Sequence, residues 1–188
     1  MSESKKTELI EKALKAYYAG GFQAVGMDRL ARETGISKTS MYKHFRKKED
    51  LILEVLSLRD EQFRNWFIRR IEEMANNPTD RLLAIFDALG EWFEEEGFLS
   101  CMFIRASCEY LNHEDPIHKA SANHKRLLLA YVIGLAEQAG IKNPGVLARQ
   151  LMLLKEGAIV LAHLQGPTGV SDNAKSAASD LIMAASKA

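Results

Sequence analysis

Apolar residues recur three or four positions apart along almost the whole chain, and no stretch shows sustained alternation of apolar and polar residues. This spacing is typical of amphipathic helices and argues against strands. Glycine, proline and capping residues divide the sequence into about nine helical segments. The predicted helices cover residues 5–19, 27–34, 38–44, 47–75, 79–96, 101–111, 117–139, 146–165 and 171 to the end. We therefore predict an all-α protein, whose first helix turns Ile10, Ala13, Leu14 and Tyr17 inward.

The segment from Met27 to Phe45 meets the requirements of a helix-turn-helix one by one. Ala31 is small enough for two short helices to cross closely, and Gly35 supplies the positive φ that a sharp turn needs. Ser37 is a good N-cap for the second helix. Gly26 caps the first, and Ile36 and Met41 fill the gap between the two.

The second helix of this motif is left with side chains that are nearly all hydrogen-bond donors or acceptors, as a helix in a DNA major groove requires. They are Lys38, Thr39, Ser40, Tyr42, Lys43 and His44. The net charge of the chain is zero, yet from Ser37 to Lys48 there are five basic residues and no acidic one. Such local charge suits a polyanion. Spacing and charge alone leave two interpretations open, a DNA-binding motif or two solvated helices joined by a glycine turn.

Several short motifs resemble the signature of the TetR family of repressors. They are Gly21-Phe22, Met27-Asp28-Arg29-Leu30-Ala31, Gly35-Ile36-Ser37, Met41-Tyr42-Lys43-His44-Phe45 and Lys48-Glu49-Asp50-Leu51. The resemblance implies a three-helix helix-turn-helix domain over residues 1–50. A long fourth helix would join it to a helical effector-binding and dimerisation domain over residues 51–188. The sequence departs from the family pattern at Gly26, where a threonine cap is common, and at Arg46-Lys47.

The resemblance also assigns roles to residues of the motif. Lys38, Thr39 and Ser40 would face bases or the adjacent backbone, Tyr42 and His44 would contact phosphates, and Lys43 could do either. Lys48 would grip a phosphate beside the N-terminus of the fourth helix.

The last two predicted helices suit pairing with a second copy, since their apolar residues are too many for one buried face. Two copies would place two recognition helices on a palindromic operator. The resemblance to the family also favours a homodimer. The predicted interface residues are Leu147, Leu151, Leu154, Ala158, Leu161, Ala174, Ala178 and Leu181.

The middle helices are rich in aromatic residues, most of which we expect in the core. The resemblance implies that some line a cavity for a small-molecule effector. The candidates are Trp66, Phe86, Cys101, Met102, Arg105, Tyr110, Arg126 and His163.

Cys101 is also the basis of an alternative. The stretch from Gly97 to Ile104 resembles the Gly-Cys segment of a TetR subgroup that includes the N-ethylmaleimide reductase repressor. A thiol at a helix N-terminus has a lowered pKa and is more reactive. Sensing of electrophiles or redox state by Cys101 is therefore an alternative to effector binding. The other interpretation of Cys101 is an inert buried cysteine.

Other classes of protein find little support. No His-Glu-x-x-His, Gly-x-Ser-x-Gly, phosphate-loop or Cys-x-x-Cys pattern is present, and His113 and His118 are loosely spaced. We therefore expect no enzyme, metal or cofactor. With two cysteines, no secretory signal and no membrane-length apolar run, a cytoplasmic protein is expected. The prediction is a ligand-responsive repressor that leaves a palindromic operator when a small molecule binds, with a transcriptional activator as the alternative.

Overall fold

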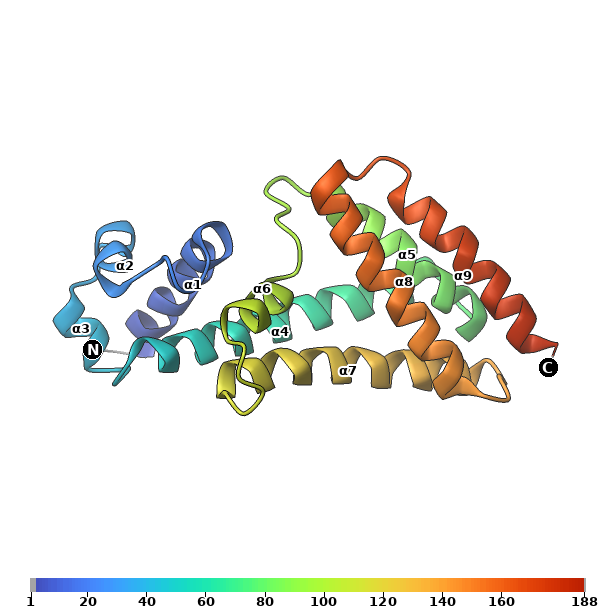
Figure 1. Cartoon of the computed structure of the whole chain (residues 1–188), viewed down its shortest axis with the longest axis horizontal. Coiled ribbons are helices and arrows are strands. Elements are labelled where there is room, and N and C mark those ends of the chain that lie inside the picture. The colour runs from blue at the N-terminus through green and yellow to red at the C-terminus, as the bar shows by residue number, and fades with distance from the viewer. Residues whose placement is uncertain (1–2, 188) are drawn as a thin grey trace. The chain divides into compact units, whose positions relative to one another are not determined.

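The computed structural model describes residues 3–187, and over this range the protein is all-α (Figure 1), as predicted. The described residues form nine helices. They are α1 (Glu3–Gly20), α2 (Met27–Thr34), α3 (Lys38–Tyr42), α4 (Lys48–Met74), α5 (Pro78–Glu94), α6 (Met102–Glu109), α7 (Pro116–Gln138), α8 (Pro144–Gln165) and α9 (Val170–Ser186).

Most helix ends fall within a few residues of their predicted positions, because local capping determines them. The prediction for α3 was too long: the N–H groups of His44 and Phe45 both donate to the carbonyl of Met41, at 2.9 and 3.0 Å. The chain therefore turns after Tyr42, and His44 lies beyond the helix. Helix α5 begins one residue before its predicted start, and the side chain of Asn77 caps it by accepting the N–H of Asp80 at 2.9 Å.

The α9 helix begins one residue earlier than predicted. Gly169, with a φ of 72°, is its N-cap. Glycine adopts this left-handed conformation at little steric cost. The tight turn after α8 therefore leads directly into α9.

The chain packs as two compact units. The first contains the described residues up to Phe63 together with Cys101–His124, and the second contains Arg64–Ser100 and the described residues from Lys125 onward. Helices α1, α2, α3 and α6 therefore belong to the first unit, and α5, α8 and α9 to the second. Helix α6 shares a unit with the helix-turn-helix although about 60 residues of chain separate it from α3.

In the first unit, the buried side of α1 differs from the predicted stripe. Leu9, Ala13 and Tyr17 are fully buried, whereas Ile10 and Leu14 are only half-buried. Near-equal apolar spacing at neighbouring positions allowed either face, and packing against α2 selected one. Leu9, Ala13 and Tyr17 are therefore the residues that α1 contributes to the core of this unit.

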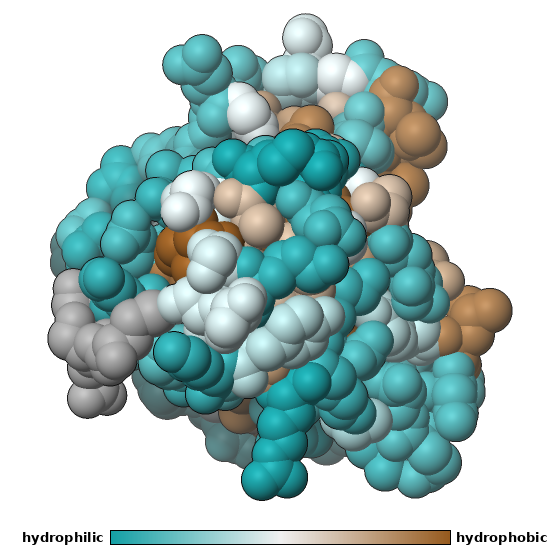
Figure 2. All heavy atoms as spheres, turned by 90° about the vertical axis from the view of Figure 1, so that its left-hand side faces the viewer, coloured by the Kyte–Doolittle hydropathy of each residue, from teal (hydrophilic) through white to brown (hydrophobic). Residues whose placement is uncertain are grey.

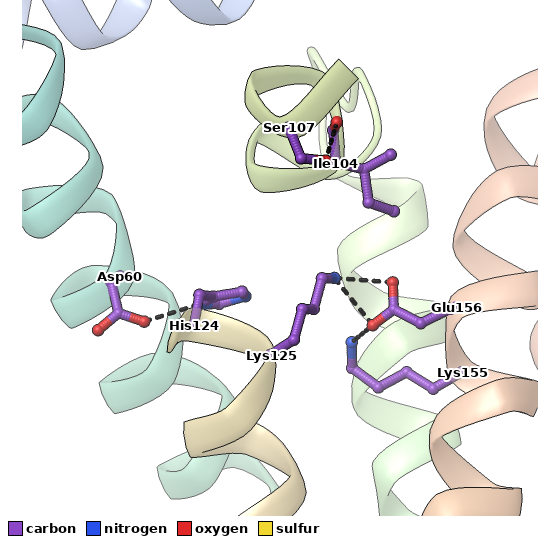
Figure 3. Close-up of polar contacts among 7 residues, drawn as sticks. All are labelled: Asp60, Ile104, Ser107, His124, Lys125, Lys155 and Glu156. Atoms are coloured by element: carbon purple, nitrogen blue, oxygen red, sulfur yellow. Dashed lines mark hydrogen bonds and ion pairs between the residues drawn. The ribbon is translucent and has the colours of Figure 1, made fainter. Parts of the chain in front are cut away.

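A buried histidine joins three elements of the first unit. Nδ1 of His124 on α7 lies 2.7 Å from Oδ1 of Asp60 on α4 (Figure 3). The ring of His124 also stacks on Phe103 of α6, with centroids 3.7 Å apart and planes 9° apart. The buried polar ring thus has a hydrogen-bond partner, as burial requires.

In the second unit, α5, α8 and α9 pack against one another. The small residues Ala174 and Ala178 of α9 are buried, which permits close approach of the helices. On α5, a Cβ added at Gly90 would lie 2.8 Å from Oγ of Ser171. Ala174 and Ala178, which were predicted for pairing between copies, therefore pack inside their own chain.

The second unit also buries a charge cluster. The carboxylate of Glu156 accepts Nζ of Lys125 at 2.7 and 2.8 Å and Nζ of Lys155 at 2.9 Å, as Figure 3 shows. Burial by itself would raise the pKa of Glu156, but the charges of Lys155 and Lys125 outweigh it and lower the pKa to about 2. The glutamate therefore remains ionised, and it compensates the almost fully buried Lys155.

Within residues 3–187, none of the helices is both long enough and apolar enough to cross a membrane.

Candidate nucleic-acid interface

The turn between α2 and α3 is built from Gly35 and Thr34. Gly35 has a φ of 71°, and its N–H donates to the carbonyl of Ala31 at 3.1 Å. The hydroxyl of Thr34 is buried; it donates to the carbonyl of Leu30 at 2.7 Å and accepts the N–H of Ile36 at 3.2 Å. Gly35 was predicted for this turn. The part played by Thr34 was not, although a threonine before a helix-ending glycine is a signal for such local hydrogen bonds.

The inner side of α3 fixes this short helix to its unit. The hydroxyl of Ser37 accepts the N–H of Ser40 at 3.2 Å, which confirms the predicted cap. Met41 is fully buried and Phe45 nearly so. With five residues, α3 is too short to be stable alone, so these anchors determine its direction.

The outer side of α3 carries the side chains predicted to meet DNA. Lys38, Thr39, Tyr42 and Lys43 are exposed, and Tyr42 presents 47% of its surface to solvent. Figure 2 views the side on which α2 and α3 lie, and hydrophilic residues dominate it. An exposed tyrosine among lysines and a threonine can donate hydrogen bonds to phosphates and base edges.

Lys38 already has an ionic partner. Its Nζ lies 2.9 Å from Oδ1 of Asp28 on α2, and this hydrogen bond raises the pKa of Lys38. Both side chains are exposed, so the pair is screened by water and salt. The lysine is therefore charged, and it can exchange the aspartate for a phosphate at low cost.

The remaining predicted contacts are less accessible. Ser40 and His44 are half-buried. Nε2 of His44 is buried without a hydrogen-bond partner among the described residues. The imidazole ring lies beside the ring of Phe45, with centroids 6.4 Å apart. In this conformation, a phosphate contact by His44 requires its Nδ1.

Lys48 is held by the protein itself. Its Nζ donates to the carbonyls of Phe22 and Gln23, at 3.0 and 3.4 Å. The side chain is half-buried. The structure thus gives the predicted phosphate ligand a second task, which is to hold the loop between α1 and α2.

Four of the predicted effector residues lie on or beside α6 in the first unit. Cys101, Met102 and Tyr110 are almost fully buried. Burial and the nearby Glu49 raise the pKa of Tyr110 to about 12. Arg105 is half-buried, and its Nη1 donates to the carbonyl of Tyr18 at 2.6 Å.

The other four predicted effector residues lie in the second unit. Phe86 is fully buried in the core and Trp66 is half-buried. Arg126 and His163 are exposed. A buried aromatic residue fits either a core or a cavity wall, so the role of these residues stays a prediction.

The residues predicted for the dimer divide into buried and exposed groups. Most of them lie in the core of their own chain: Leu147, Leu151, Ala158, Ala174 and Ala178. Leu154 and Leu181 are half-buried, and Leu161 is exposed. Both the buried and the exposed faces of α8 carry apolar residues, and the part that these residues play in a dimer stays a prediction.

Exposed apolar residues also line one face of α8. They are Val146, Leu153, Val160, Leu161 and Leu164. Positions 146, 153, 160 and 164 are spaced seven, seven and four residues apart, which places them on one side of a helix. Leu153 and Leu164 are 74% and 71% exposed. An apolar stripe of this kind is typical of an interaction surface.

Comparison with known proteins agrees with this geometry. Residues 9–55 match the family described as "Bacterial regulatory proteins, tetR family", and this range contains α2, the turn and α3. The HTH-type transcriptional regulator YjdC of Escherichia coli is 20% identical over 94% of this chain and 93% of its own. The HTH-type transcriptional repressor KstR2 of Mycolicibacterium smegmatis is 32% identical over 48% of this chain and 44% of its own.

The fold has a similar counterpart among solved structures. SCO4454, a TetR-family transcriptional regulator from Streptomyces coelicolor, superimposes with a TM-score of 0.89 and 27% identity. The match covers 96% of this chain and 95% of that one, so it includes the helices outside the motif. The chain therefore belongs to the TetR family of helix-turn-helix DNA-binding transcriptional regulators and is not an enzyme.

Proposed function

We propose that the protein is a homodimeric repressor that binds a palindromic operator and leaves it when a small molecule binds. The observation that supports this proposal most directly is the exposed polar side of α3, where Lys38, Thr39, Tyr42 and Lys43 face solvent above the buried Met41. Base contacts from α3 would choose the sequence, while phosphate contacts would fix the register.

In this proposal residues 1–50 bind DNA, and residues 51–188 bind the effector and the second copy. Two copies are needed because a single short recognition helix covers too few base pairs for selective binding. The exposed apolar stripe of α8 is the surface proposed to join them. The effector would shift the balance between two arrangements of the recognition helices by binding one of them more tightly.

The test is a selection of duplex DNA from a random pool with the purified protein, followed by titration of the selected duplex. A palindromic site is expected, with affinity that falls steeply as salt rises. A protein that binds all duplexes equally at low salt would contradict the proposal.

Repression and activation are separated by a reporter gene placed behind the selected site. Repression predicts that expression falls when the protein is supplied, whereas a rise would identify an activator. The thiol alternative is tested by the same reporter in a Cys101→Ser strain exposed to an electrophile. Unchanged release in this variant excludes sensing by Cys101.

A further inference from the structure

Helix α6 carries two charged side chains that bind the backbone of the DNA-binding motif. Arg105 and Glu109 are four residues apart, so they share one side of the helix. Nη1 of Arg105 donates to the carbonyl of Tyr18 at 2.6 Å. The carboxylate of Glu109 accepts the N–H groups of Phe22 and Gln23 at 3.1 and 2.6 Å. Tyr18 lies at the end of α1, and Phe22 and Gln23 lie in the loop that follows it.

These backbone groups need partners for a simple reason. No N–H group of the helix donates to its last carbonyls, and a cation near them is favourable. The N–H of Gly21 satisfies the carbonyl of Tyr17 at 2.9 Å, and Arg105 satisfies the next one. Charge-assisted hydrogen bonds of this type are stronger than neutral ones.

Gly21 prepares the loop for the carboxylate. Its φ of 82° turns the chain so that two successive N–H groups can meet one anion. A Cβ at this position would lie 3.0 Å from Oε1 of Glu109. The backbone conformation therefore favours glycine here, and a larger residue would also displace the carboxylate of Glu109.

The same loop is held from a second side. Lys48 at the start of α4 donates to the carbonyls of Phe22 and Gln23, while Glu109 accepts their N–H groups. The ring of Phe22 is buried and stacks on Tyr17, with centroids 5.3 Å apart. Helix α2 begins at Met27, four residues after Gln23. A loop held at its side chain and at both kinds of backbone group determines where α2 and α3 lie.

We propose that Arg105 and Glu109 are positioning residues for DNA binding, and that this face of α6 sets the orientation of α2 and α3 through the loop at residues 21–23. The inference rests on the proposed use of α3 as the recognition helix. It gives Arg105 a different role from the effector contact predicted from sequence.

The test compares Glu109→Gln with the matched variant Glu114→Gln. Glu114 loses the same charge, but its carboxylate is exposed and binds Lys119 at 2.6 Å, away from the loop. In Glu109→Gln, amide hydrogen exchange at Phe22 and Gln23 is expected to rise about ten-fold or more, because a charge-assisted bond is lost. Affinity for the duplex selected by the wild-type protein should fall about ten-fold.

The distinguishing measurement is affinity for a random duplex of the same length. Nonspecific binding depends on charge rather than on alignment with base edges, so mispositioned recognition helices lower specific affinity and leave nonspecific affinity unchanged. A purely structural role for Glu109, acting through partial unfolding, would lower both affinities by the same factor. Glu114→Gln should change neither amide exchange nor either affinity.

Arg105→Gln provides a second variant should Glu109→Gln fail to fold, since it removes one bond of the same face and keeps the carboxylate. Specific affinity equal to that of wild type in the folded variants, or an equal loss of specific and nonspecific affinity, would overturn the inference. A wild-type protein that selects no duplex would instead contradict the proposed function itself.

Discussion

Helices α3 and α8 both present an exposed face, but the two faces have opposite chemistry. On α3 and its C-cap the exposed residues are Lys38, Thr39, Tyr42 and Lys43, which carry charges or hydroxyl groups. On α8 the exposed residues include five leucines and valines, among them Leu153. A polyanion is bound by donors and cations, whereas a stable partner protein requires apolar surface to be removed from water. The contrast indicates which macromolecule each face is suited to meet.

Charge follows the same division. The lysines of α3 are exposed, where the desolvation cost is small and a phosphate can replace an existing partner. On α8, Lys155 is almost fully buried beside Glu156. A charge that is removed from water must be paired permanently. One helix thus keeps its charges available, and the other uses them to complete a core.

The largest expected effect comes from a charge placed on the apolar face. Leu153→Glu would bury an unpaired carboxylate in the proposed dimer interface, which costs several kcal/mol, on the order of a hundred-fold or more in dimer affinity. Analytical ultracentrifugation should show a monomer at concentrations where wild type is dimeric. Affinity for the selected palindrome should fall by a comparable factor.

The matched control is Leu111→Glu. Leu111 is 76% exposed, about as much as Leu153, but it lies in the first unit rather than on α8. This variant should remain dimeric and bind the palindrome normally. A dimer that persists in Leu153→Glu removes the exposed stripe of α8 from the proposed interface.

The second prediction concerns the buried charge of α8. In Glu156→Gln the buried Lys155 loses its anionic partner, and the free energy of unfolding near neutral pH should fall by up to about 3 kcal/mol. Because the folded-state pKa of Glu156 is lowered from 4.5 to about 2, its contribution is present above pH 4.5 and is lost as pH falls toward 2. Urea unfolding at several pH values measures this difference.

The variant should therefore lose less stability than wild type between pH 4.5 and 2. Glu8→Gln is the control, because Glu8 pairs with Lys12 on the exposed surface of α1. Its stability should stay close to that of wild type at every pH. Parallel acid profiles for wild type and Glu156→Gln would show that the charge cluster contributes nothing to folding.

The sequence predicted best what local chemistry controls. Gly35 at the turn and Ser37 at the cap were found because their partners lie within four residues. The buried face of α8 was not found in this way, because both faces of that helix are apolar and periodicity cannot show which of them is buried. The bonds from Arg105 to Tyr18 and from Glu109 to Phe22 span 87 residues each, and no sequence pattern links such distant positions.

A smaller effect is expected on the polar face. Lys43→Ala removes one exposed cation of the recognition segment, so affinity for the palindrome should fall about five- to ten-fold and the salt dependence should lose about one unit of slope if the contact is to phosphate. Fluorescence anisotropy titrations at several salt concentrations measure both quantities. Arg69→Ala is the control, since Arg69 is 70% exposed in the second unit, outside the motif. Equal losses in the two variants would mean that α3 has no special part in binding.

The smallest expected effect tests whether the direction of α3 depends on its cap. Ser37→Ala leaves the N–H of Ser40 without the hydroxyl that accepts it at 3.2 Å, which costs about 1 kcal/mol at a typical N-cap. Thermal unfolding should show this loss, whereas Ser57→Ala, at an exposed position within α4, should be neutral or slightly stabilising. Since Met41 and Phe45 still anchor the helix, affinity for the palindrome should fall only a few-fold. A loss as large as that of Leu153→Glu would mean that the cap, rather than the buried anchors, holds α3 in position for the groove.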